Sequence, residues 1–224
     1  MCGVIGVSLN NVTEMNLENL RRLFVETEIR GRHATGISWV KDGVLHTIKE
    51  SVPASEFLTQ HNLKDCVDSD NSLSLIGHIR YSTSDLRYNQ PFSDGATSIV
   101  HNGVLSQEHS STWKYPCKTE NDSEMILHSI QAGKHPLSDF ADASLAVCTL
   151  TSDKTLQCYR NGERPLWYVR QENGFIFMST EDIALRAGYK NPMITMMNMV
   201  HTVTDNGMST YIEESNDSRD LQRV

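Results

Sequence analysis

Short stretches in which apolar residues dominate or alternate with polar ones recur along the chain, a pattern typical of β-strands. An Asp-Gly pair at 42–43 separates two such stretches and favours a tight hairpin turn, because glycine readily takes the positive φ that the turn needs. Strands are predicted over residues 2–9, 35–40, 44–50, 72–80, 96–104, 143–150, 155–161, 166–171, 174–179 and 199–204.

A longer period marks the helices. Within residues 13–31, four apolar residues recur at helical spacing opposite a charged face, and Gly31 supplies a stop signal. These four are Leu17, Leu20, Leu23 and Phe24. Further helices are predicted over residues 54–63, 121–133 and 180–188.

No repeat, low-complexity tract or shift in composition divides the chain. Many strands that alternate with a few helices predict a layered domain of α and β structure. We expect this domain to cover residues 1–204, and residues 205–224 to form a polar C-terminal tail.

Composition and charge narrow the possible function. The 224 residues, 38% of them hydrophobic, are enough to bury a substantial core. The formal net charge of −8 supplies no basic surface, which disfavours a nucleic-acid-binding groove.

The five cysteines are an odd number and contain no Cys-x-x-Cys pair, which argues against a disulfide framework or a zinc cluster. The apolar run at the N-terminus has no basic residues before it and ends at the polar segment 8–11, so it does not match a signal peptide. No apolar run reaches the roughly 20 residues that cross a bilayer. We therefore expect a cytoplasmic protein that does not bind membranes.

Cys2 is the most informative single residue. It could be a chance occurrence or a small apolar residue at the start of a buried strand. Alternatively, removal of Met1 would leave a thiol and a free α-amino group on one residue, which would combine a nucleophile with a base.

Four other segments carry polar residues within or beside predicted strands and helices: 30–36, 77–83, 101–103 and 120–124. Taken singly, each has an ordinary explanation: a hairpin or strand-end turn at 101–103, a surface or ion-pair residue at Arg80, and a helix N-cap at Asp122. Three histidines, His33, His78 and His101, share no metal-ligand spacing, and no metal site is expected.

Taken together and in this order, the segments resemble the glutaminase domain of the class II, or N-terminal-nucleophile, glutamine amidotransferases. That domain also occurs in amidophosphoribosyltransferase and glucosamine-6-phosphate synthase. The resemblance runs from Cys2 to about residue 203. It rests on "CGVIG", "RG" before "TGI", "GHIRYST" followed by "NQPF", "IVHNGVL", "T-x-x-D-S-E" and "RNGERPLWY".

The resemblance implies an α+β fold, a four-layer αββα sandwich in which two mainly antiparallel sheets are flanked by helices. It also implies hydrolysis of L-glutamine through a thioester on Cys2, with no cofactor. Amide hydrolysis needs a nucleophile, a proton shuttle and donors for the oxyanion. By resemblance, the side-chain amide of Asn102 and the backbone N–H of Gly103 are those donors.

Free glutamine differs from a glutamine residue in a peptide by its two charged ends. By resemblance, Arg80 binds the α-carboxylate and Asp122 binds the α-ammonium. Thr83 and the backbone of Tyr81 and Ser82 line the same pocket. The loop 80–88 resembles a lid over the substrate, and Arg30 supports the turn at the nucleophile.

The sequence departs from the family pattern at two places. His33 and Ala34 stand where an acidic residue and a serine are common, which leaves a supporting hydrogen bond open. Ser84 and Asp85 stand where glycine is usual shortly after the loop threonine, so the loop geometry is open as well.

We expect no synthase domain in this chain and therefore a separate enzyme that accepts the ammonia. Two other hypotheses remain open. One is a related hydrolase of another amide or a γ-glutamyl compound, which is tested by whether Arg80 and Asp122 converge on one pocket. The other is a glutamine-binding module without catalytic activity.

Overall fold

The structure is a computed structural model that describes residues 1–82 and 86–213. In chain order its strands are β1 (Gly3–Leu9), β2 (Ala34–Lys41), β3 (Val44–Glu50), β4 (Leu73–Arg80), β5 (Phe92–Ser93), β6 (Thr97–His101), β7 (Ala146–Thr151), β8 (Leu156–Arg160), β9 (Trp167–Gln171), β10 (Gly174–Met178), β11 (Met193–Ile194), β12 (Met199–Thr204) and β13 (Gly207–Ile212). The helices are α1 (Glu14–Thr27), α2 (Ala54–Gln60), α3 (Glu124–Gln131), α4 (Pro136–Asp139) and α5 (Glu181–Arg186), with 3₁₀ turns η1 (Glu28–Arg30), η2 (Leu63–Cys66) and η3 (Ser110–Thr112).

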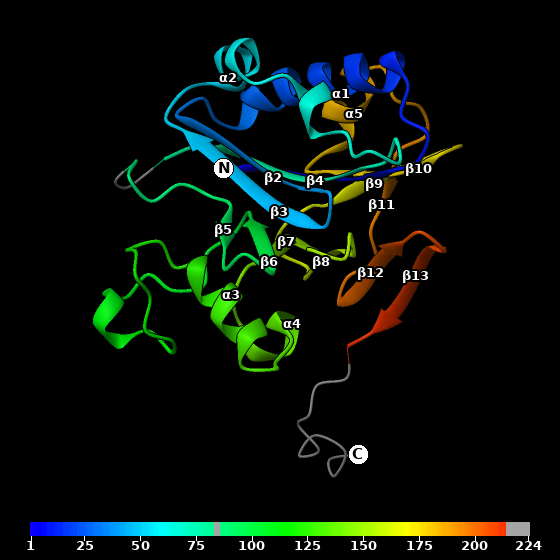
Figure 1. The fold of residues 1–224 in the computed structure, drawn as a ribbon. Helices are drawn as coiled ribbons and strands as arrows, with labels where there is room; N and C mark the ends of the chain where they lie inside the picture. The colour runs from blue at the N-terminus through cyan, green and yellow to red at the C-terminus, as the bar shows by residue number, and fades with distance from the viewer. Residues whose placement is uncertain (83–85, 214–224) are drawn as a thin grey trace.

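Two antiparallel sheets face each other between two layers of helices (Figure 1). The seven-stranded sheet has the order β11-β9-β10-β1-β4-β2-β3, and α1, α2 and α5 cover its outer face. The six-stranded sheet has the order β13-β12-β8-β7-β6-β5, with α3 and α4 on its outer side. The predicted four-layer αββα sandwich is confirmed.

Each gap between layers has its own apolar cluster. Phe24 of α1 and Ile5 of β1 belong to the cluster between the helices and the seven-stranded sheet. Val4, the neighbour of Ile5, points to the opposite face and joins Cys148 in the cluster between the two sheets. The alternation of side chains along a strand therefore lets β1 serve two cores at once.

The first helix begins at a capping box. Thr13 Oγ1 accepts a hydrogen bond from the Asn16 backbone N–H, and Asn16 Oδ1 accepts one from the Thr13 backbone N–H. The α-helix ends at Thr27 and continues as η1 to Arg30, so the predicted stop at Gly31 is confirmed for the helical segment as a whole.

The segment after residue 204 is more ordered than the sequence indicates. Residues 207–212 form β13, which pairs with β12 through a turn in which Gly207 has a φ of 107°. Four of the six residues of β13 are exposed, which explains why its sequence is too polar to predict a strand. In the part of the chain that the structure describes, no helix is long and apolar enough to cross a membrane.

Candidate active site

A pocket of about 490 Å³ lies where β1 begins and where β4 and β6 end. Five of the residues singled out from the sequence line this pocket: Cys2, Arg80, Tyr81, Gly103 and Asp122. Asn102 is buried next to Gly103. Arg80 and Asp122 therefore converge on one pocket, as binding of an amino acid by its two charged ends requires.

Antiparallel pairing brings Cys2 and Arg80 together. Gly3 of β1 is the register partner of Ile79 of β4. Cys2, which precedes β1, therefore lies beside Arg80, the last residue of β4. Two further contacts hold this end of β1. The Cys2 carbonyl accepts a hydrogen bond of 2.7 Å from Arg30 Nε, and Ser179 Oγ accepts one of 2.9 Å from the Val4 N–H.

The Cys2 thiol donates to the Tyr81 carbonyl oxygen over 3.8 Å. Burial raises the pKa of this thiol above its ordinary value, and the positive charges of the chain terminus, Arg80 and Arg30 offset part of the rise. The thiol is therefore protonated at neutral pH, and a nucleophilic role requires a base that removes its proton.

Arg80 is 4% exposed, and its guanidinium is held by the loop that follows β4. Its Nη1 donates to the Tyr88 carbonyl at 3.1 Å and to Asn89 Oδ1 at 2.5 Å. These bonds aim a buried cation at the pocket, where a carboxylate would find a strong partner.

The backbone after Arg80 packs closely against the turn before β2. A Cβ built on Gly31 would lie 2.3 Å from the Tyr81 backbone nitrogen, so only glycine fits there. His33 supplies the supporting contact that the sequence left open. Its Nδ1 accepts from the Ser82 N–H at 2.8 Å, and its backbone N–H donates to the Arg80 carbonyl.

Three residues of the predicted lid, Thr83, Ser84 and Asp85, lie outside the described residues. Tyr81, which is 51% exposed, lines the pocket, whereas Ser82 is not among its lining residues and donates its backbone N–H to His33. The roles predicted for Thr83 and for the loop therefore stay predictions.

The segment 101–103 lies at the end of β6, in agreement with the strand-end turn that its three letters allow. Asn102 exchanges two backbone hydrogen bonds with Ala146 of β7, which fixes its main chain. The side chain is 3% exposed, and its Nδ2 has no hydrogen-bond partner among the described residues. A buried amide with an unused donor is costly, and it is what an oxyanion site needs.

Gly103 must be glycine. A Cβ at this position would lie 1.8 Å from the Ser144 carbonyl oxygen and 2.4 Å from His101 Nε2. Within the described residues, no hydrogen bond uses the Gly103 N–H. The peptide can therefore present a backbone donor next to the Asn102 amide.

Asp122 precedes Ser123, the N-cap residue of α3, so it does not cap the helix as the single-residue interpretation suggests. Its Oδ2 accepts hydrogen bonds from the backbone N–H groups of Leu105 at 2.6 Å and Ser106 at 3.1 Å. Neutral groups thus hold the carboxylate at the pocket wall, in position to meet a cation.

Several lining residues were not singled out as site residues from the sequence, among them His78, Gln90, His101 and Ser123. His78 lies in a strand whose residues are all buried. Burial lowers the pKa of His78 to about 3, so its ring is neutral, and its Nε2 has no partner among the described residues. A polar residue inside an apolar strand pattern is the signal that could have marked it.

Among residues 1–82 and 86–213, no group of three or more His, Cys, Asp or Glu side chains is arranged to hold a metal ion.

The chain is similar to known proteins in sequence and in fold. The family model described as a glutamine amidotransferase domain matches residues 66–216. The chain is 27% identical over 191 residues to the glutamine–fructose-6-phosphate aminotransferase (isomerizing) of Sulfurisphaera tokodaii, which covers 79% of this chain and 31% of that protein. It is 29% identical over 213 residues to the chloroplastic amidophosphoribosyltransferase of Glycine max, which covers 82% of this chain and 35% of that protein.

The chain therefore spans about a third of the length of these curated relatives. Among solved structures, glutamine phosphoribosylpyrophosphate amidotransferase from B. subtilis has a TM-score of 0.71 at 19% identity and covers 94% of this chain and 49% of its own. A glutamine aminotransferase class-II domain protein from Silicibacter pomeroyi has a TM-score of 0.56 at 12% identity and covers 95% and 99%. These two structures support the fold.

The family match covers more than half of the chain and includes β4, the end of β6 and the start of α3, from which most of the pocket is built. The resemblance found in the sequence is confirmed. The chain belongs to the class II, N-terminal-nucleophile glutamine amidotransferases, and it is an enzyme of the amidotransferase type.

Proposed function

We propose that this protein hydrolyses free L-glutamine to glutamate and ammonia through a thioester on Cys2, and that a separate enzyme accepts the ammonia. One observation supports this most directly. A single pocket contains a thiol, a buried guanidinium and a carboxylate held by neutral groups, and a buried amide donor lies beside it.

Cys2 acts after the peptide bond to Met1 has been cleaved. Met1 is exposed, so a peptidase can reach this bond. The freed α-amine, whose ordinary pKa is about 8, then takes the proton from the thiol of the same residue. The sulfur attacks the carboxamide carbon, and the C=O electron pair moves to the oxygen.

Asn102 Nδ2 and the Gly103 N–H stabilise the resulting oxyanion. When the tetrahedral intermediate collapses, the C–N bond breaks and the nitrogen leaves as ammonia with the proton from the amine. Water then attacks the thioester through a second oxyanion, which releases glutamate and restores the thiol.

Arg80 and Asp122 select the substrate by its charged ends. The planar guanidinium of Arg80 binds the α-carboxylate, and Asp122 binds the α-ammonium. A compound that lacks either end would leave one of these charged groups without its partner. Such a compound should therefore bind more weakly than glutamine. Free glutamine is therefore favoured over a glutamine residue inside a peptide.

The ammonia goes to a partner enzyme in the cytoplasm. The names of two relatives, a glutamine–fructose-6-phosphate aminotransferase and an amidophosphoribosyltransferase, indicate enzymes that transfer a nitrogen group, which supports an acceptor for the ammonia. All five cysteines are free thiols, as expected for a reducing compartment.

Two measurements test this function together. Intact mass shows whether Met1 is absent and whether a glutamine-analogue alkylator adds once, at Cys2. A glutaminase assay then compares the wild-type protein with Cys2→Ala. Activity on γ-glutamyl compounds but not on glutamine would favour the related hydrolase. Glutamine binding without turnover, with Met1 retained, would favour the silent module.

Co-purification from a native lysate tests the partner. We expect an ammonia-consuming synthase to be recovered with the wild-type protein. Failure to recover any synthase, by stable or cross-linked association, counts against transfer to a separate enzyme.

A further inference from the structure

One short segment contacts pocket residues from both sheets, Arg80 at the end of β4 and His101 at the end of β6. Residues 88–91 connect the loop after β4 to β5, and Asn89 and Gln90 are both buried. Lys49 Nζ holds this segment by donating to the carbonyls of Asn89 and Pro91 at 2.8 and 3.0 Å. The segment is therefore fixed from the side of the seven-stranded sheet.

Gln90 extends the six-stranded sheet with its side chain. Phe92 of β5 pairs with Ile99 of β6, and the same register places Gln90 opposite His101. The Gln90 amide makes the two bonds that a strand residue would make there. Its Oε1 accepts from the His101 N–H at 2.6 Å, and its Nε2 donates to the His101 carbonyl at 3.1 Å.

The second N–H of the same amide reaches α3. Gln90 Nε2 also donates to Ser123 Oγ at 3.1 Å, and Ser123 is the residue after Asp122. The Ser123 hydroxyl lies 2.9 Å from His101 Nδ1, and His101 Nε2 lies 3.0 Å from the Ser144 carbonyl.

The direction of these bonds is settled by chemistry. The Ser144 carbonyl can only accept, so His101 Nε2 carries the proton. Burial lowers the pKa of His101, so the ring is neutral and Nδ1 accepts from the Ser123 hydroxyl. Both N–H groups of the Gln90 amide are consequently used, and none is left to donate to a substrate.

The neighbouring residues of the segment hold the charged groups. Asn89 Oδ1 and the Tyr88 carbonyl accept from Arg80 Nη1, and the Tyr88 carbonyl also accepts from Asn121 Nδ2 at 2.9 Å. Asn121 is the residue before Asp122. Residues 88–90 thus contact Arg80 and His101. They also contact Asn121 and Ser123, the two residues that flank Asp122.

We propose that Gln90 is a positioning residue that aims the donors of Asn102 and Gly103, whereas Asn89 positions Arg80 for the substrate carboxylate. This assignment rests on the proposed glutaminase function. Gln90 acts through the His101 backbone, so its loss misplaces donors that matter most in the transition state. Asn89 acts through Arg80, so its loss weakens binding of glutamine before any bond changes.

The experiment compares steady-state glutamine hydrolysis by wild type, Gln90→Ala, Gln90→Glu and Asn89→Ala. Gln90→Glu keeps the acceptor for the His101 N–H and loses both donated bonds. We expect both Gln90 variants to lower kcat by about tenfold to a hundredfold with little change in KM. Asn89→Ala should raise KM more than it lowers kcat. Gln131→Ala, which removes an exposed amide bonded to Asp94, is the matched control.

A second readout separates positioning from general damage. Alkylation of Cys2 by iodoacetamide needs the thiolate but no oxyanion donor, so its rate should stay at the wild-type value in the uncharged variant Gln90→Ala. If the wild type is active and kcat is unchanged in both Gln90 variants, the role of Gln90 is overturned but the proposed glutaminase function is not. Equal losses in kcat and in alkylation rate also overturn it. An inactive wild type overturns the proposed function as well, and if Gln90→Ala does not fold, Gln90→Glu decides.

Discussion

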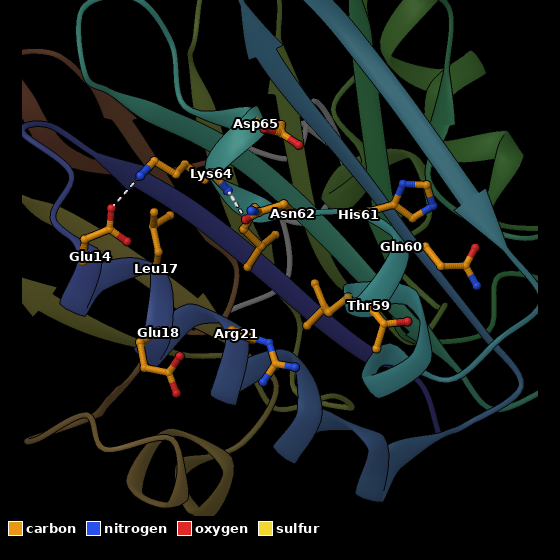
Figure 2. Close-up of a pocket in the computed structure, with 12 residues that line it drawn as sticks. Glu14, Leu17, Glu18, Arg21, Thr59, Gln60, His61, Asn62, Lys64 and Asp65 are labelled. Carbon is orange, nitrogen blue, oxygen red and sulfur yellow. Dashed lines mark hydrogen bonds and ion pairs between the residues drawn. The ribbon is translucent and has the colours of Figure 1, made fainter.

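Two pockets of similar size differ in how their polar groups are used. The pocket between α1 and the α2–η2 segment has a volume of about 580 Å³ (Figure 2). There, Glu14 and Lys64 pair with each other at 2.7 Å, and His61 pairs with Glu50 at 2.8 Å. Both members of the Glu14–Lys64 pair are largely exposed, so water competes with their attraction.

The Cys2 pocket, of about 490 Å³, is the smaller of the two. Backbone and amide groups hold Arg80 and Asp122, and the buried Asn102 Nδ2 and His78 Nε2 have no hydrogen-bond partner among the described residues. Folding rarely leaves such atoms without a partner, because each costs about 1–3 kcal/mol. Buried polar atoms without a hydrogen-bond partner among the described residues, rather than volume, thus distinguish the Cys2 pocket from the other one.

The largest expected effect that separates the two pockets comes from Cys2→Ala. Without sulfur no thioester forms, so glutaminase activity should fall by more than about a thousandfold. The assay measures ammonia release, and circular dichroism checks the fold. A Cys2→Ala protein with more than a tenth of wild-type activity would contradict the assignment of the nucleophile.

Asn102→Ala is expected to have the next largest effect. Removal of one oxyanion donor typically costs about 2.7–4 kcal/mol of transition-state stabilisation, so kcat should fall by about a hundredfold or more. Because this donor has no partner in the described protein, the melting temperature should hardly change. Thermal unfolding and kinetics are measured on the same preparation, and a large loss of stability would show that Asn102 has a structural partner.

Arg80→Lys tests the charge at the other end of the substrate. A lysine keeps the positive charge but loses the planar, two-pronged donor geometry, so KM for glutamine should rise by about tenfold to a hundredfold. Glutamine amide derivatives that lack the α-carboxylate serve as the control. Their already poor turnover should change little, and an equal loss for both substrates would argue against a carboxylate clamp.

His78 predicts a pH effect on stability. The pKa of the folded-state imidazole is lowered to about 3 by burial, whereas that of the unfolded chain stays near the ordinary value of about 6.5. Between these values the unfolded chain binds a proton that the folded protein excludes, so the free energy of unfolding falls as the pH decreases. His78→Gln should flatten this fall, and chemical denaturation at pH 4 to 7 measures it.

The matched control for His78 lies in the other pocket. His61→Gln removes a partly exposed ring that bonds to Glu50 and should leave the slope with pH closer to that of wild type. An identical slope in wild type and His78→Gln would show that another group causes the acid sensitivity.

Lys64→Ala, in the pocket of Figure 2, should have the smallest effect. Its ion pair with Glu14 is exposed, so neither the glutaminase kinetics nor the melting temperature should change measurably. A clear change in kcat would mean that this pocket communicates with the catalytic one.

The longer helices and strands could be predicted because each spans enough residues to show its hydrophobic periodicity. The strands that contain Val4 and Ile76 are mostly apolar, and α1 has a clear apolar stripe and a stop at Gly31. By contrast, β5, β11 and α4 span two to four residues, too few to show a period.

The site could be predicted only as far as local motifs extend. Cys2, Arg80 and Asn102 stand in motifs whose residue types suit amide chemistry, and the structure brings them to the same end of the sandwich. Gln90 could not be singled out, because its role depends on the register between β5 and β6 and on the position of Ser123. Such information is tertiary and has no local pattern.

The reacting groups also divide between the two sheets: the thiol comes from the seven-stranded sheet and the amide donors from the end of β6. The sheets meet so closely that a Cβ on Gly6 would lie 3.1 Å from Cys158 Sγ. The catalytic rate therefore depends on the relative position of the two sheets. During gradual denaturation, catalysis should disappear while the circular dichroism of the strands is still intact.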